Sequence, residues 1–168
     1  LNVAAIESGQ TQFKLVAVDV LATLQALITY YQQQFKAKNL DLQLIYTDKH
    51  YLAYADTHAL QQVLDNLISN AIKYSPPNKT ITLRLQQDHQ AVRCHVHDQG
   101  PGISEAEQPK LFGKFTRLTT RPTAGEHSTG LGLFIVKKLV EAMQGQVWYQ
   151  NQAHQGSIFT IQLLSYQR

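Results

Sequence analysis

The chain has 168 residues, of which 43% are hydrophobic, enough for the core of one domain. Its formal net charge is +3 and its lysines and arginines are scattered, so the composition does not indicate a nucleic-acid-binding surface. It contains no run of 18 apolar residues, which argues against a membrane-spanning helix, and its single cysteine, Cys94, excludes an internal disulfide.

Residues 1–9 have apolar positions at helical spacing and end at Gly9, which predicts the last turns of a helix. The chain begins without a methionine, and so short a helix is unstable alone, so we expect it to continue a helix of a longer protein. A second helix is predicted from Asp19 to about Lys38 by apolar residues at helical spacing. Apolar and polar residues alternate at 40–46, with a second short stretch at 51–54, and both predict strands.

The strongest helical pattern begins at Asp56 or Thr57 and ends before the sequence Ser75-Pro76-Pro77. Strands are predicted after it at 80–86 and 91–98.

Residues 100–129 form a long irregular segment with a short helical stretch near 105–112, and such a loop in a compact domain is usually functional. A helix at 130–143 and strands at 146–150 and 157–164 complete the chain. This order predicts an α+β fold, a two-layer α/β sandwich in which a mixed sheet of about five strands carries three main helices on one face.

The helix that begins near Thr57 carries Asn66, Asn70 and Lys73 along one stripe, because they are spaced four and three residues apart. A carboxamide oxygen is a suitable ligand for Mg²⁺ when phosphates supply the negative charge, and a lysine ammonium suits a phosphate. The alternative is an ordinary polar face of a helix, and the stripe alone does not decide between them.

Asp98 ends the buried face of the strand at 91–98, so its carboxylate is expected near the core and needs a hydrogen-bond donor. The exocyclic amine of adenine would serve, and Gly100 and Gly102 would let the backbone pass close to a flat ring. A simple Asp-x-Gly turn at the end of a strand explains the same residues equally well.

Gly130 and Gly132 precede the helix at 130–143 and expose backbone N–H groups at its start, which favours an anion site. A glycine pair is weak evidence alone. The pattern is neither the GxGxxG of a Rossmann fold nor a P-loop.

Together these segments resemble the catalytic domain of sensor histidine kinases. The matching segments, in chain order, are the N box at 65–76, the G1 box at 98–103, the F box at 111–117, the G2 box at 128–133 and a closing Gly-x-x-Phe strand at 156–159. The resemblance covers 11–168, and residues 1–10 resemble the end of the dimerisation helix that precedes this domain. One departure is Ser128, where the family often has glycine.

The resemblance implies the Bergerat ATP-binding fold of gyrase, Hsp90, MutL and histidine kinases. It implies that Asn70 holds Mg²⁺ with Asn66 beside it, and that Asp98 binds the adenine amine. It also implies that Phe112 and Phe115 anchor a lid. The residues expected at the ATP are Asn66, Asn70, Lys73, Tyr74, Asp98, Gly100, Gly102, Ile103, Phe115, Thr129, Gly130, Leu131, Gly132 and Leu133, with Arg117 joining Asn66, Asn70 and Lys73 as catalytic residues.

No histidine of the chain stands in the phosphoacceptor pattern His-Glu/Asp-x-x-x-x-Pro. The resemblance therefore implies that this chain binds Mg-ATP and donates the γ-phosphoryl group to a histidine on its protein's own dimerisation domain. It further implies a homodimeric full-length protein that serves a response regulator, a monomeric fragment, no nucleic-acid partner and a cytoplasmic location, with or without a membrane anchor.

Two other functions remain open. An ATP hydrolase of the gyrase or Hsp90 type has a glutamate where this chain has Asn66, and Asp65 is about 100° around the helix, so hydrolysis is disfavoured. A regulatory module that binds nucleotide without catalysis is disfavoured by the complete set of expected residues.

Overall fold

The computed structural model describes residues 3–116, 130–151 and 156–167. The elements in chain order are α1 (Val3–Glu7), β1 (Val16–Asp19), α2 (Val20–Tyr30), α3 (Gln32–Ala37), β2 (Asp41–Ile45), β3 (Leu52–Ala55), α4 (Thr57–Tyr74), β4 (Thr80–Gln87), β5 (Ala91–Asp98), a 3₁₀ helix (Gln108–Lys110), α5 (Gly132–Ala142), β6 (Gln146–Asn151) and β7 (Ser157–Leu164). Within these ranges, none of the helices has the length and apolar content that crossing a membrane requires.

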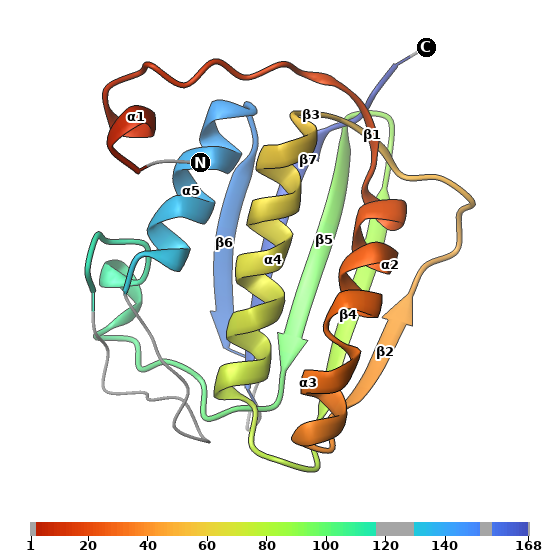
Figure 1. Ribbon diagram of the computed structural model, residues 1–168, viewed down its shortest axis with the longest axis vertical. Helices are drawn as coiled ribbons and strands as arrows, with labels where there is room; N and C mark the ends of the chain where they lie inside the picture. Colours follow the sequence, from red (N-terminus) through yellow and green to blue (C-terminus); the bar gives the residue numbers. More distant parts are fainter. Residues whose placement is uncertain (1–2, 117–129, 152–155, 168) are drawn as a thin grey trace.

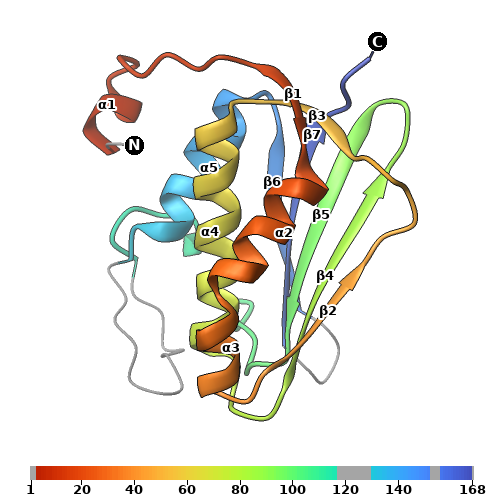
Figure 2. The same cartoon turned by 45° about the vertical axis from the view of Figure 1, so that its right-hand side comes forward.

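Five strands form the main sheet in the order β2-β4-β5-β7-β6. The β2–β4 pair is parallel and the other neighbours are antiparallel, so the sheet is mixed. The helices α2 to α5 cover one face of this sheet, as Figures 1 and 2 show from two sides. The α+β sandwich predicted from the sequence is confirmed.

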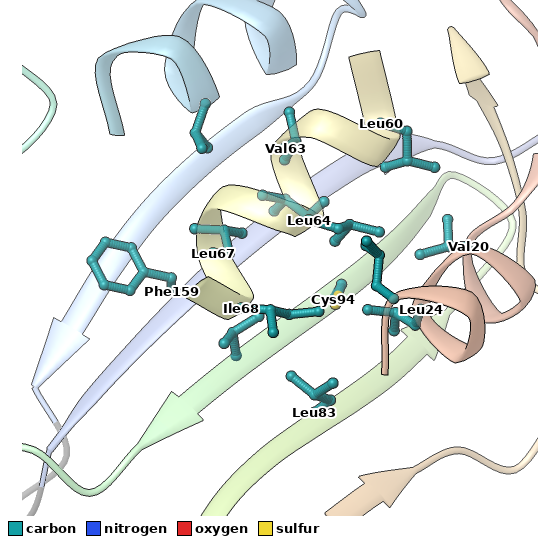
Figure 3. Packing of buried hydrophobic residues seen from close by; sticks show 14 of the residues in the cluster. Val20, Leu24, Leu60, Val63, Leu64, Leu67, Ile68, Leu83, Cys94 and Phe159 are labelled. Atoms are coloured by element: carbon teal, nitrogen blue, oxygen red, sulfur yellow. The ribbon is translucent and has the colours of Figure 1, made fainter. Parts of the chain in front are cut away.

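The helix α4 is the central element of the core. The Asp56 side chain accepts a hydrogen bond from the N–H of Ala59 at 3.0 Å and so caps the helix start. The apolar face that follows is buried between α2, α5 and the sheet (Figure 3). At the other end Ser75 adopts an extended conformation, as expected for a residue before proline. Cys94 belongs to the same core, and burial raises the pKa of its thiol to about 12.

The predicted helix from Asp19 to Lys38 starts where expected, because Asp19 is the N-cap of α2, but it is not continuous. It is divided into α2 and α3 at Tyr31, whose hydroxyl donates a 2.5 Å hydrogen bond to Asp65 of α4. Asp19 itself ends β1, a strand that the sequence did not predict and that pairs with β3 in a separate two-stranded sheet. The Asp19 carboxylate accepts from the N–H groups of Leu21 and Tyr51, which joins the helix start to the neighbouring strand.

The other predicted elements are present with ends shifted by a few residues. The helical stretch near 105–112 is reduced to the 3₁₀ helix, and the helix predicted from Gly130 begins at Gly132.

Candidate nucleotide-binding site

The N-box stripe of α4 lies against the start of α5. Asn66, Asn70 and Lys73 are partly exposed residues of a helix whose opposite face is fully buried. The carboxamide nitrogen of Asn66 donates to the carbonyl oxygen of Gly132 at 3.4 Å. The structure therefore brings the asparagine stripe and the second glycine segment together.

The last turn of α4 lies against the loop that follows β5. A Cβ atom placed on Gly100 would lie 2.4 Å from the carbonyl oxygen of Tyr74, so only glycine permits this approach. Tyr74 lies eight residues after Asn66, which places it about 12 Å further along the helix. One helix thus contacts both glycine segments, near its middle and at its last turn.

Asp98 is a buried carboxylate at this loop, with only 4% of its surface exposed. Burial raises its pKa to about 6, although hydrogen bonds from the backbone N–H groups of Gly100, at 2.8 Å, and Ser157 act in the opposite direction. Gly156 packs directly on the Asp98 backbone, where a Cβ atom would lie 1.8 Å from the carbonyl oxygen. At neutral pH the buried Asp98 side chain is therefore mostly ionised and can accept hydrogen bonds.

The backbone of the F-box segment at Phe115 and Thr116 packs against Gly130 of the second glycine segment. Gly130 has a positive φ of 76°, and a Cβ atom there would lie 2.9 Å from the carbonyl oxygen of Thr116. Phe112 packs edge-to-face against Phe159 with ring centroids 6.3 Å apart. Phe115, by contrast, is 63% exposed, so of the two phenylalanines expected to anchor a lid only Phe112 contacts the core.

The remaining predicted residues lie around these contacts. Ile103 and Leu133 are partly buried against the core, and Leu131 directly precedes α5. Arg117 and Thr129 lie outside the described residues, as does Ser128.

Lys38 is a residue of the site region that sequence reasoning missed. Its ammonium group is buried and donates to the carbonyl oxygens of Ile72, at 2.6 Å, and Lys73, at 3.1 Å. A cation at this position satisfies carbonyl groups that the helix end leaves unpaired and complements the helix dipole. No local sequence pattern could indicate it, because the two partners are 34 and 35 residues away.

Asp65 also has a partner that the sequence did not indicate. Its carboxylate accepts the hydrogen bond from Tyr31, and burial together with this neighbouring carboxylate raises the pKa of the Tyr31 hydroxyl. Asp65 is therefore held toward α2, away from the asparagine stripe.

The donor atoms of the stripe fit a metal ion that arrives with phosphates. Among residues 3–116, 130–151 and 156–167, no group of three or more histidine, cysteine, aspartate or glutamate side chains is placed to hold a metal. The carboxamide oxygens of Asn66 and Asn70 are neutral ligands of the kind Mg²⁺ accepts when a nucleotide provides the charged oxygens.

Comparison with known proteins gives the family. The sequence profile described as histidine kinase-, DNA gyrase B-, and HSP90-like ATPase matches residues 55–167. The chain belongs to this ATPase family. The match includes α4, both glycine segments and the closing hairpin, so the elements that form the candidate site are those of the ATPase domain.

The relatives of this ATPase domain are sensor histidine kinases, as the sequence motifs predicted. The circadian input-output histidine kinase CikA of Synechococcus elongatus is 35% identical over 96% of the chain, which spans 22% of CikA. The structure of full-length ShkA in complex with AMPPNP has 25% identity and a TM-score of 0.82, covering 98% of this chain and 34% of ShkA. Histidine kinase ThkA in complex with the response regulator TrrA shares the fold with a TM-score of 0.78 at 22% identity, over 98% of this chain and 46% of that one.

Proposed function

We propose that this ATPase domain binds Mg-ATP and donates its γ-phosphoryl group to a histidine on the dimerisation domain of the same protein. The observation that carries the proposal is that α4 contacts both glycine segments, while Asp98 lies buried in the first of them. This arrangement supplies a candidate base-binding end at Asp98 and a candidate phosphate-binding end at the start of α5, along one helix.

At the base end, Asp98 accepts a hydrogen bond from the exocyclic amine of adenine. The carboxylate is already fixed by two backbone N–H groups, so it needs no reorganisation when the base arrives. Guanine would present a carbonyl oxygen where adenine presents its amine. Repulsion between that oxygen and the carboxylate favours ATP over GTP.

At the phosphate end, the backbone N–H groups at the start of α5, an 11-residue helix, attract the phosphates together with Lys73. Asn70, with Asn66 beside it, would hold Mg²⁺, which when bound neutralises charge on the triphosphate. These residues position the γ-phosphorus, which is most of what phosphoryl transfer requires from a protein. A nitrogen of the acceptor histidine then forms the N–P bond as the bond to the β-phosphate oxygen breaks and ADP leaves.

The side chains on the stripe favour transfer to histidine over hydrolysis. Asn66 stands where a hydrolase of this family needs a proton acceptor, and a carboxamide cannot take a proton from water. Asp65, the neighbouring carboxylate, is engaged with Tyr31. Neither residue is placed to activate a water molecule.

The proposal extends to a longer protein, because the chain spans only 22% of the length of its relative CikA. We expect a homodimeric sensor kinase whose ATP-binding domain works in the cytoplasm and whose phosphoryl group passes to a response regulator. The ThkA–TrrA complex shows such a partner for a protein of the same fold.

A labelling experiment in trans tests this function. The chain is mixed with the dimerisation segment of its own protein and with ATP labelled at the γ-phosphate, with an Asn70→Ala variant as control. Acid-labile, base-stable label on the segment, absent with the variant, supports the proposal. Free phosphate would identify a hydrolase, and nucleotide binding with neither product would identify a regulatory module.

A further inference from the structure

The edge strand β6 supplies two side chains that hold the loop after β5. The carboxamide nitrogen of Asn151 donates to the carbonyl oxygen of Ile103 at 2.9 Å, and the Ile103 N–H donates to the Asn151 carboxamide oxygen at 3.2 Å. A single side chain therefore pairs with both backbone polar groups of Ile103. The Ile103 carbonyl oxygen also accepts from the Gln108 carboxamide nitrogen at 3.0 Å, so the contact with β6 matters most for the N–H, which in a loop outside any strand ladder would otherwise need water or another partner.

Tyr149 reinforces this contact from the same face of β6. Its hydroxyl accepts a hydrogen bond from the Ile103 N–H at 2.9 Å, and it also contacts the carboxamide oxygen of Asn151. On its other side the hydroxyl lies 3.0 Å from the Ser157 hydroxyl oxygen. Burial raises the pKa of the Tyr149 hydroxyl, so it remains protonated at neutral pH and able to donate.

These contacts are continuous with Asp98. Ser157 is the cross-strand neighbour of Asp98, and its backbone N–H donates to the Asp98 carboxylate. The hydroxyl of Tyr149 thus joins the loop at Ile103 to the residue that fixes Asp98.

The shape of the loop is matched to the Asn151 side chain. Gly102 has a positive φ of 76°, and a Cβ atom there would lie 3.0 Å from the carboxamide oxygen of Asn151. Any other residue at 102 would both strain the backbone and push the carboxamide away. Gly102 therefore leaves the space that the Asn151 side chain occupies beside the loop.

We propose that Tyr149 and Asn151 form a clamp that positions the base-binding loop for adenine. The inference rests on the proposed function, because it takes Asp98 and the loop at 100–103 as the base-binding end. A loop already held in its binding conformation loses less conformational freedom when the ligand arrives, so the clamp increases affinity without touching the nucleotide. Tyr149 and Asn151 are positioning residues in this sense.

The Ile103 N–H is shared between the two clamp residues, which determines the variants to test. Asn151→Ala and Tyr149→Phe each leave one acceptor for it, and only the double variant removes both. Gln150→Ala is the matched control, because Gln150 is exposed and alternation along the strand directs its side chain to the opposite face of the sheet.

Calorimetric titration with AMPPNP measures the effect on binding. We expect Kd to rise about threefold to tenfold in each single variant and more than about tenfold in the double variant, from the loss of one to three hydrogen bonds. The control should remain within about twofold of the unaltered chain.

Hydrogen exchange at the Ile103 amide, measured without nucleotide, is the second readout. Faster exchange in the double variant, with the β5 amides unchanged, together with weaker binding supports the clamp. Faster exchange with unchanged Kd would show a merely structural role, and weaker binding with unchanged exchange would show that the loop is held by other contacts. Both results overturn the inference. If the unaltered chain does not bind AMPPNP, the proposed function fails and the clamp's role in binding fails with it.

Discussion

Replacing Asp98 with asparagine should stabilise the nucleotide-free domain while weakening nucleotide binding. Burial raises the pKa of Asp98 from its ordinary value of 3.8 to about 6. Because the folded state holds the proton more tightly than the unfolded state, the protonated form contributes stability below pH 4, which is lost as the pH rises through about 6. The shift corresponds to about 3 kcal/mol of unfolding free energy.

The Asp98→Asn variant is neutral at every pH and therefore avoids this loss. Its single carboxamide oxygen can keep the Gly100 N–H, but its NH₂ group faces the N–H of Ser157, so relative to the protonated carboxyl one hydrogen bond worth about 1.5 kcal/mol is lost. At pH 7.5 the variant should accordingly be more stable than the unaltered domain by about 1.5 kcal/mol. At pH 4 this order should reverse, because the unaltered Asp98 is then protonated too.

Urea unfolding of both chains at several pH values between 4 and 7.5 measures the difference directly, since groups other than Asp98 titrate alike in both. AMPPNP titration at pH 7.5 should show Kd raised by about tenfold or more in the variant, from the loss of a charged acceptor. A stability difference that does not change with pH, or a variant that is less stable at pH 7.5, would refute the assignment of a buried, destabilising carboxylate.

Three further substitutions test the packing at Gly100, the cation at the end of α4 and the role of Asn70. Gly100→Ala should raise the Kd for AMPPNP by more than about tenfold, because the new methyl group would lie 2.4 Å from the Tyr74 carbonyl oxygen; unchanged affinity would contradict this packing. Lys38→Met should lower the unfolding free energy by about 2 kcal/mol in urea, because it removes the cation from the end of α4, whereas the exposed Lys36→Met should change it little. Asn70→Ala should abolish transfer of labelled phosphate while altering stability by less than about 0.5 kcal/mol, and full transfer would remove this residue from the mechanism.

Helices and strands were predicted best where residues close together in the sequence determine them. The long apolar face of α4, its Asp56 cap and the prolines after Ser75 are all local, and the structure has the helix within these bounds. The alternation in β5 correctly placed Asp98 on the buried face. The family motifs then grouped segments that the fold does bring together.

Features that depend on distant partners could not be predicted. The break at Tyr31 is accompanied by a bond to Asp65, 34 residues away, and β1 exists because it pairs with β3. The contacts of Asn151 with Ile103 span 48 residues and join two segments that carry no shared pattern. Such side-chain contacts follow from the assembled sheet and have no signature in either segment alone.

Because α4 has one buried and one partly exposed face, a residue on its exposed face can change without disturbing the core. Its leucine-lined side is buried in the core, whereas Asn66 is partly exposed and its carboxamide nitrogen donates to the carbonyl oxygen of Gly132 at the start of α5. Replacing this carboxamide with a glutamate, one methylene longer, would introduce a proton acceptor on the partly exposed side and leave the buried leucines in place. Evolution could thus convert a phosphate donor into a water-activating enzyme, or the reverse, at one solvent-accessible position without rebuilding the scaffold.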